Sequence, residues 1–307
     1  MRRLFAVLAA AVLALTLAGC GGGGNPLSGG GGNGGGSSKK MIVGSANFPE
    51  DALIAEIYAQ ALEGKGLQVK RKFNIGAREA YAHAMQDGSI NLIPEYTGNL
   101  WLYLSKSKSG RSLSPEQVYA KLKKSMPKGQ TVLKMSSAED KDAIAVTQET
   151  ANKYNLKAIG DLKPYAPKMV LGGPPEWPKR PDGPKGQKRV YGLDWKQFKA
   201  LDTAGPITVK SLKDGSVDAA DLFTTQSAIA QNNFVALQDP KHLFLAQNVV
   251  PWISKKVTTP KVRSTLNAIS AKLTTGKLKK MNKQITVDKT APAVVAKQFL
   301  DQNGLAS

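Results

Sequence analysis

The chain has 307 residues, of which 43 are Lys or Arg and 23 are Asp or Glu, so its formal net charge is +20. Its single cysteine excludes an intrachain disulfide, and the fold must therefore depend on a packed core. The lysines are spread singly, with no patch of interleaved aromatic residues and no known reader motif. The charge therefore favours anionic lipid headgroups, wall polymer or simple solubility over nucleic acid.

The first twenty residues are typical of an export signal. A positive start, Met1 to Arg3, precedes the apolar run "LFAVLAAAVLALTL" and the small-residue stretch "LAGC", which ends at Cys20. The apolar run is shorter than the roughly 20 residues that a membrane-spanning helix needs. Cleavage here would remove Arg2 and Arg3, leaving 41 basic against 23 acidic side chains, or +18.

"LAGC" resembles the bacterial lipobox, in which cleavage falls before the cysteine and its thiol carries lipid. The resemblance implies a lipid anchor at Cys20 and an extracytoplasmic protein held at the cell membrane, on the cell surface or in the periplasm. An ordinary secretory signal with a chance cysteine is the alternative. Residues 21–40 are rich in glycine and predict a flexible tether. Residues 41–307 are long enough for one large or two modest domains.

The elements after the tether alternate between strands and helices. "KKMIVGS" (39–45) predicts a strand, "PEDALIAEIYAQALEGKG" (49–66) a helix, and "LQVKRKFNI" (67–75) a second strand. "AREAYAHAMQDGS" (77–89) predicts a helix that ends at Asp87-Gly88, and "INLIPEY" (90–96) a strand that closes on Tyr96. This alternation indicates the α/β class, whose ligands bind outside the carboxyl ends of strands.

Three later segments have clear patterns. "DAIAVT" (142–147) and "NVVPWI" (248–253) are apolar and predict strands, whereas "VRSTLNAISAKLTTGKL" (262–278) predicts an amphipathic helix with a solvated basic face.

One sequence frame occurs twice. "QDGSINLIPEYTG" (86–98) and "KDGSVDAADLFTT" (213–225) both place an Asp-Gly-Ser turn before an apolar run, and each run closes on an aromatic ring followed by threonine. In the ungapped register Tyr96 and Phe223 occupy the same position. Two α/β lobes of like construction would bring these rings to opposite sides of a groove. We therefore expect a two-ring clamp for a small ligand.

Catalysis finds little support in the sequence. His83 and His242 have no partner at metal-ligand spacing, and no G-x-S-x-G, H-E-x-x-H or P-loop pattern is present. Glu139 and Asp140 are neighbours in a charged loop, which we expect to be solvated. The sequence indicates a protein that is not an enzyme and needs no cofactor or metal.

Several ordered blocks resemble the glycine betaine/choline/carnitine binding proteins of ABC importers. They are "VGSANFPEDALIAEIYAQALEGKGLQV", "DGSINLIPEYTGNL", "GPPEWPKRPDG", "VYGLDWKQFKALDTAGPITVKSLKDGSVDAADLFTT", "NVVPWISKK" and the tail from 266 to 305. The resemblance implies the two-lobe, type II fold of periplasmic binding proteins, with a ligand cleft between lobes. Lobe 1 would comprise 41–141 and 249–307, and lobe 2 residues 142–248. The strands at 142–147 and 248–253 would be the two hinge crossings.

The same resemblance implies a function. The chain would capture a quaternary-ammonium osmoprotectant of the glycine betaine, choline or carnitine type and deliver it, as a monomer, to an ABC permease with its ATPase. Aromatic faces attract such a cation, and an arginine fork suits a ligand carboxylate. The alternatives are a sensor or adhesion module on the same fold, or a receptor for a different small cation.

Carried over by position, the resemblance implies a set of ligand-binding residues. Tyr96 matches the cage tyrosine, Phe223 replaces a second tyrosine, and Arg180 matches the arginine that meets the carboxylate. Asp142 stands where another tyrosine is usual and would suit a choline-like cation or one with N–H donors; alternatively, it pairs with Arg180 or a lysine. The remaining candidates are Gln247, Asn99, Ala46, Asn47 and Thr224. Trp177 and Tyr191 are either cleft or packing residues.

Overall fold

The computed structural model describes residues 40–108 and 112–306. The predicted signal, the predicted lipid site at Cys20 and all but the last residue of the predicted tether lie outside the described residues. The described residues all belong to a single compact unit. In the described part of the chain, no helix combines the length and the apolar character that crossing a bilayer requires.

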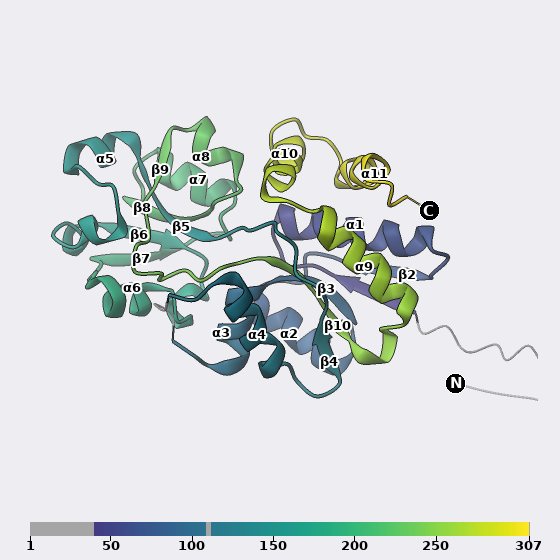
Figure 1. The fold of residues 1–307 in the computed structure, drawn as a ribbon. Coiled ribbons are helices and arrows are strands. Elements are labelled where there is room, and N and C mark those ends of the chain that lie inside the picture. Colours follow the sequence, from purple (N-terminus) through teal and green to yellow (C-terminus); the bar gives the residue numbers. More distant parts are fainter. Residues whose placement is uncertain (1–39, 109–111, 307) are drawn as a thin grey trace, which may run out of the picture. The chain divides into compact units, whose positions relative to one another are not determined.

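Two sheets of five strands each organise the described residues (Figure 1). The first sheet has the order β2-β1-β3-β10-β4, and the second has the order β7-β6-β8-β5-β9. The strands of the first sheet are β1 (Met41–Gly44), β2 (Val69–Lys72), β3 (Leu92–Tyr96), β4 (Gln130–Val132) and β10 (Val249–Ser254). Those of the second are β5 (Asp142–Thr147), β6 (Val170–Gly173), β7 (Gln197–Ala200), β8 (Ala219–Phe223) and β9 (Phe234–Ala236).

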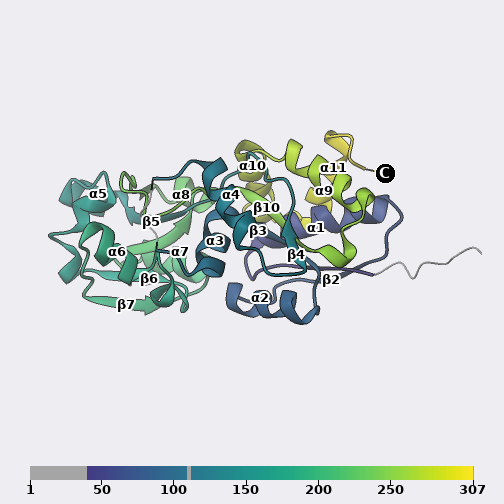
Figure 2. The ribbon, with the colours of Figure 1, turned by 60° about the horizontal axis from the view of Figure 1, so that its bottom comes forward.

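Helices cover the sheets, and we call each sheet with its helices a lobe. The helices of lobe 1 are α1 (Pro49–Gly64), α2 (Arg78–Asp87), α3 (Thr97–Ser105), α4 (Pro115–Ser125), α9 (Pro260–Lys272), α10 (Thr275–Thr286) and α11 (Pro292–Gln302). Those of lobe 2 are α5 (Gln148–Tyr154), α6 (Pro184–Tyr191), α7 (Pro206–Lys213) and α8 (Ser227–Gln231). Short 3₁₀ turns are η1 (Ile159–Leu162), η2 (Ala166–Lys168), η3 (Trp177–Lys179) and η4 (Lys255–Val257). The two lobes lie side by side in both views (Figures 1 and 2).

The α/β alternation predicted from the sequence is confirmed from β1 to β3. The first strand pairs in parallel with β2 and β3, as helical connections between strands require. The amphipathic segment 262–278 differs from the prediction, because it forms two helices, α9 and α10. Thr274 separates them by capping α10, its side chain accepting a hydrogen bond from the Lys277 N–H.

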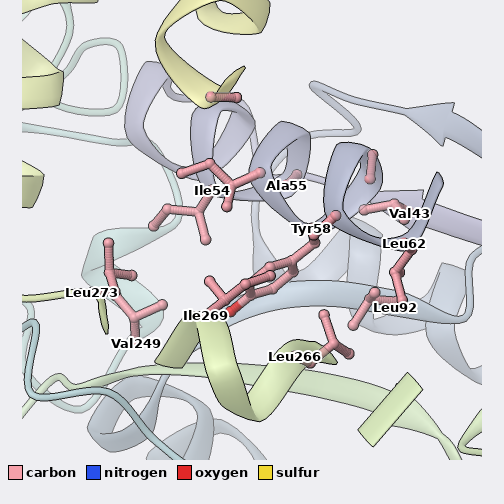
Figure 3. Close-up of a cluster of buried hydrophobic side chains, with 14 of the residues drawn as sticks. Val43, Ile54, Ala55, Tyr58, Leu62, Leu92, Val249, Leu266, Ile269 and Leu273 are labelled. Atoms are coloured by element: carbon pink, nitrogen blue, oxygen red, sulfur yellow. The ribbon is translucent and has the colours of Figure 1, made fainter. Parts of the chain in front are cut away.

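The core of lobe 1 lies on both faces of its sheet. Helices α1 and α9 both lie against one face and contact each other, so Tyr58 and Leu62 pack near Leu92, Leu266 and Ile269 (Figure 3). Helices α2, α3 and α4 cover the opposite face (Figure 1). This double covering fixes the carboxyl end of β3, and with it the position of Tyr96.

The chain passes twice between the sheets, through crossing 1 (residues 133–141) and crossing 2 (residues 237–248). The two crossings are hydrogen-bonded to each other. Asp140 N donates to Gln247 O at 3.2 Å, and Glu139 forms an isolated antiparallel β-bridge with Asn248. The strands predicted as crossings are instead inside the sheets, β5 antiparallel to β8 and β10 antiparallel to β3. Apolar strands buried on both faces gain more from full sheet pairing than from spanning a cleft.

Gly98, at the start of α3, allows crossing 2 to approach that helix closely. A Cβ at this position would lie 2.7 Å from Ala246 O and 2.8 Å from Leu245 Cβ. We therefore expect Gly98→Ala to lower the free energy of unfolding by about 1–3 kcal/mol in urea titrations, because backbone must move. Gly276→Ala in α10 is the matched control: its Cβ would meet nothing within 4 Å, so a gain of about 0.5 kcal/mol is expected. Equal stability of both variants would contradict this packing.

Candidate ligand-binding site

A cavity of ≈ 50 Å³ lies between the lobes. Its walls come from the segment after β1, the end of β3, the start of α2, the beginning of β5, the end of β8 and the loop after η3. Ala46, Asn47, Tyr96, Asn99, Asp142, Arg180 and Phe223, all expected from the sequence, line it. The volume holds only a few water molecules, so a larger solute needs the walls to move apart.

The repeated sequence frame builds equivalent positions in the two lobes. Gly88 and Gly215 both have positive φ, 82° and 74°, which lets each helix end in a tight turn. The N–H groups of Ser89 and Ser216 donate to the aspartates two residues earlier, at 2.7 and 3.1 Å. The strands that follow, β3 and β8, are each the central strand of their sheet. Tyr96 and Phe223 therefore end equivalent strands and reach one cavity.

A third ring, Phe48, packs between the two. Its centroid lies 6.1 Å from that of Tyr96 and 5.2 Å from that of Phe223, the latter edge to face. The cleft thus has a wall of three rings rather than the expected two-ring clamp. Ligands of α/β folds bind outside the carboxyl ends of strands, and this rule indicated Tyr96. Phe48 follows the carboxyl end of β1, so the same rule applies to Phe48.

Tyr96 is held from behind by a buried carboxylate. Its hydroxyl donates to Glu50 Oε1 at 2.6 Å, and the Thr225 hydroxyl donates to Glu50 Oε2 at 2.5 Å. The Asn282 amide also donates to Glu50 Oε2. Burial raises the pKa of Glu50, while these hydrogen bonds oppose the rise. Since Thr225 belongs to lobe 2 and the other groups to lobe 1, this network also joins the lobes.

The charged wall contains two arginines that already have partners. Arg78 Nε donates to Glu95 at 2.6 Å, and Arg180 Nη2 donates to Glu79 Oε2 at 3.2 Å across the cleft. Asp142 accepts a hydrogen bond from Asn99 Nδ2 at 2.9 Å, also across the cleft. The Asp142–Arg180 pair considered from the sequence is therefore not the arrangement observed.

The expectation that Asp140 is solvated is wrong. Its side chain is 6% exposed, lines the cavity, and accepts hydrogen bonds from Thr225 N at 2.9 Å and Thr224 Oγ1 at 3.2 Å. Burial and the Glu50 charge raise the pKa of Asp140. The reason is topological, because crossing 1 carries Asp140 between the lobes. No local pattern in "SAEDKD" indicates this.

Two expected residues lie beside the cavity lining rather than in it. Gln247 is buried, and its Oε1 accepts a hydrogen bond from Asn99 N at 2.9 Å. Thr224 Oγ1 accepts one from Lys141 N at 3.0 Å. Gln247 therefore positions the lining residue Asn99, and Thr224 positions Asp140, to which its hydroxyl also donates.

Several residues that line the cleft were not among the candidates from the sequence. Trp177 and Tyr191, for which the sequence left open a cleft or a packing role, do not line the cavity. Sequence reasoning missed Phe48 as a ring of the site, along with Asp140, Ala77, Arg78, Tyr81 and Thr203. Trp177 is buried in the lobe 2 core, 6.5 Å from Phe198 between ring centroids. The Tyr191 hydroxyl donates to Asp239.

Two more buried acids lie close to Arg180. The Asp182 and Asp221 carboxyl groups are each at most 3% exposed, and each has an Oδ1 atom without a hydrogen-bond partner among the described residues. Burial and the Asp142 charge raise the pKa of Asp182 to about 7 and that of Asp221 well above its ordinary value. Within 40–108 and 112–306, no three His, Cys, Asp or Glu side chains are grouped to hold a metal ion.

A fold of two α/β lobes with a polar and aromatic cleft between them defines a solute-binding protein. The family model described as the substrate binding domain of ABC-type glycine betaine transport systems matches residues 39–302, and the chain belongs to this family. Family members work outside the cytoplasm together with an ABC permease. The resemblance seen in the sequence is thereby confirmed.

Three curated relatives are each about one quarter identical to the chain. The glycine betaine-binding protein YehZ of Escherichia coli is 26% identical over 274 residues, covering 85% of this chain and 90% of the relative. The carnitine transport binding protein OpuCC of Listeria monocytogenes is 25% identical over 268 residues, covering 85% and 86%. The ergothioneine transport permease/ergothioneine binding protein EgtU of Helicobacter pylori is 26% identical over 270 residues, or 86% of this chain. The chain spans only 48% of the length of EgtU.

Solved structures show the same fold. A glycine betaine/carnitine/choline ABC transporter structure has a TM-score of 0.68 at 22% identity, over 87% of this chain and all of the other. Lactococcal OpuAC, closed on glycine betaine, has a TM-score of 0.61 at 17% identity, over 87% of this chain and 96% of that one. These likenesses confirm the two-lobe α/β architecture.

The raised pKa of Asp182 gives stability a pH dependence. The native state keeps a proton on Asp182 between the ordinary pKa of 3.8 and about 7, whereas the unfolded chain loses it, so stability falls as pH rises through this window. Asp182→Asn cannot titrate. We expect its unfolding free energy, measured with urea, to decline less between pH 5 and pH 7.5 than that of the unmodified protein.

Asp194→Asn is the control, because Asp194 is an exposed carboxylate of the same lobe. This variant should keep the full decline. The same pH slope in Asp182→Asn and the unmodified protein would show that Asp182 does not titrate in this window.

Proposed function

We propose that this chain captures a small quaternary-ammonium solute between its lobes and presents it to an ABC permease. One observation carries the proposal: Phe48, Tyr96 and Phe223 line a single cavity together with Asp142. A quaternary ammonium group has no N–H to donate, so ring faces and a nearby negative charge are the groups that attract it. The names of YehZ, OpuCC and EgtU, which refer to glycine betaine, carnitine and ergothioneine, agree with a solute of this kind.

The charges around the cleft favour a solute with net positive charge. Arg180 donates to Glu79 through Nη2 and leaves its Nε without a hydrogen-bond partner among the described residues, and the Glu79 charge competes with a solute carboxylate for this guanidinium. The positive nitrogen of a choline-like solute meets Asp142 without such competition. We therefore place choline-like cations ahead of glycine betaine and carnitine as the preferred solutes.

Capture requires the lobes to open. The cavity is smaller than a trimethylammonium solute, and three hydrogen-bonded contacts close it: Arg180 to Glu79, Asn99 to Asp142 and Thr225 to Glu50. Crossing 1 and crossing 2 are the connections between the sheets. In our proposal, rotation about these crossings breaks the three contacts and admits the solute, and the lobes then close on it with the cavity walls farther apart than in the solute-free arrangement.

The rest of the function proposal depends on the sequence and the family. We propose that the chain is a monomer without catalytic activity and that its permease works with an ATPase. We place the lobe boundaries at 141/142 and 248/249. The leader and the single cysteine support a lipid anchor at Cys20, which mass spectrometry of the mature amino terminus would detect.

Phe223 tests the ring wall. Phe223→Ala removes one ring face from the cleft while leaving the core of lobe 2 intact, since Phe223 is only half buried. We expect titration calorimetry to show affinity for choline, glycine betaine and carnitine reduced about tenfold, in line with about 0.5–2 kcal/mol per ring. Phe198→Ala in β7 is the matched control and should keep its affinity within about twofold. Equal losses in the two variants would assign the effect to lobe stability.

Asp142 tests the charge preference. Asp142→Asn keeps an oxygen to accept the Asn99 hydrogen bond and removes only the charge. We expect choline binding to weaken about tenfold, as for a close, partly screened charge pair, and glycine betaine binding to change less, because its carboxylate no longer meets a negative group. Calorimetry on both solutes measures the difference. Equal changes for choline and glycine betaine would show that Asp142 does not sense solute charge.

A further inference from the structure

The positive charge of the chain is concentrated near its carboxyl end. Residues 249–307 contain 11 Lys or Arg against 2 Asp or Glu, a net charge of +9. Residues 142–248 are nearly twice as many and contain 14 Lys or Arg against 11 Asp or Glu, or only +3. Nearly half of the formal charge of +20 therefore belongs to the last helices of lobe 1.

The fold gathers these charges on one layer of helices. Together η4, α9 and α10 carry nine Lys or Arg and no Asp or Glu, and α9 and α10 pack on α1 over one face of the first sheet (Figure 1). The helices of the opposite face, α2, α3 and α4, carry four basic against three acidic side chains. Solubility alone would require no such difference between the two faces of one lobe.

We call the Lys and Arg side chains of 255–283 the basic face. All nine are exposed except Lys277, which is half-buried. None of them forms an ion pair with an acidic side chain of the described residues. The ammonium groups of Lys261 and Lys277 donate to neutral carbonyl and amide oxygens. The positive potential of the basic face therefore extends into the solvent, over about 10 Å at 0.1 M salt.

The composition of the basic face favours a lipid surface as its partner. Eight of its nine members are lysines, whose ammonium is a point charge, whereas nucleic-acid and interface sites favour the arginine fork. Residues 255–283 contain no Phe, Tyr or Trp that could stack on a base. Lysine is also depleted in protein–protein interfaces. A leaflet with many anionic headgroups needs only clustered positive charge, which the basic face has.

The basic face begins beside the point where the chain enters lobe 1. Asn91 Nδ2 donates to Lys40 O at 2.9 Å. The carbonyl of Asn91 in turn accepts a hydrogen bond from Ser254 N at 2.9 Å, and Lys255 follows in the chain. The segment predicted to lead to a lipid at Cys20 therefore joins the fold next to the basic face. A tether to the membrane at this point would raise the effective concentration of headgroups around these lysines.

We propose that the basic face is a docking surface for a membrane leaflet rich in anionic lipid. Its ammonium groups lie against lipid phosphates, and the attraction between the two sets of charges supplies the binding. The basic face belongs to lobe 1 and includes no residue that lines the solute cleft. Membrane docking and solute capture are therefore separate properties, and each can fail without the other.

Vesicle sedimentation tests the basic face. Residues 40–306 form one compact unit with a core in each lobe, so this segment can be tested without any lipid anchor. We expect it to bind vesicles of phosphatidylcholine with about 40% phosphatidylglycerol, at least tenfold more weakly at about 500 mM than at about 50 mM NaCl. Pure phosphatidylcholine vesicles should not bind. Failure to bind the anionic vesicles at low salt would overturn the proposal.

Variants of three exposed lysines in α10 locate the contact. Joint exchange of Lys279, Lys280 and Lys283 for Gln removes three charges and should weaken vesicle binding at least tenfold. Joint exchange of the same three lysines for Arg keeps the charges and should retain the affinity within about twofold. Loss of binding in the Arg variant would contradict a contact that depends on charge alone.

Joint exchange of Lys168, Lys196 and Lys199 for Gln is the matched control, because it removes the same charge from exposed positions of lobe 2. This variant should keep its affinity for the anionic vesicles within about twofold. Equal losses in the two Gln variants would overturn the location and assign the binding to net charge. Binding of soluble polyglycerol phosphate without binding of vesicles would overturn the membrane as the partner.

Discussion

The buried carboxylate of Glu50 is the group on which the cleft depends. It accepts hydrogen bonds from β3, from the segment after β8 and from α10, while its own backbone begins α1. A buried polar group that loses a hydrogen-bond partner costs about 1–3 kcal/mol, and more where the group is charged. The network therefore fixes Tyr96 and favours the closed lobes at once. The hydrogen bonds of Glu50 therefore hold the Tyr96 ring in place and join the two lobes through the same carboxyl group.

The chemistry of the cleft follows from how the lobes are connected. Crossing 1 and crossing 2 bring acidic and amide side chains, Asp140 and Gln247, between two sheets whose central strands end in rings. The arginines of both lobes are neutralised by glutamates, so the unbalanced charge of the cavity is negative. An aromatic wall beside unbalanced carboxylates attracts a cation, although the cleft also carries two guanidinium groups.

The sequence predicted those parts of the site that depend on local pattern. The repeated Asp-Gly-Ser frame located the ends of β3 and β8, and the α/β alternation explained why Tyr96 and Phe223 meet at the cleft. Asp140 could not be predicted, because its burial depends on the pairing of two crossings about 107 residues apart along the chain. Gln247 was among the candidates from the resemblance, but its supporting role behind Asn99 depends on contact between crossing 2 and α3, which no local pattern indicates. The break between α9 and α10 was missed because one apolar stripe runs through both helices, and Thr274 alone marks the boundary.

Phe48 lines both the ligand cleft and a second, larger cavity. Its ring contacts Tyr96 and Phe223 and forms part of the partition between a space of ≈ 50 Å³ and one of ≈ 330 Å³. Because the same ring lines both spaces, any movement of Phe48 that enlarges the smaller space takes volume from the larger one. The shape of the ligand cleft therefore depends on how this ring packs against Tyr96 and Phe223 as well as on the separation of the lobes.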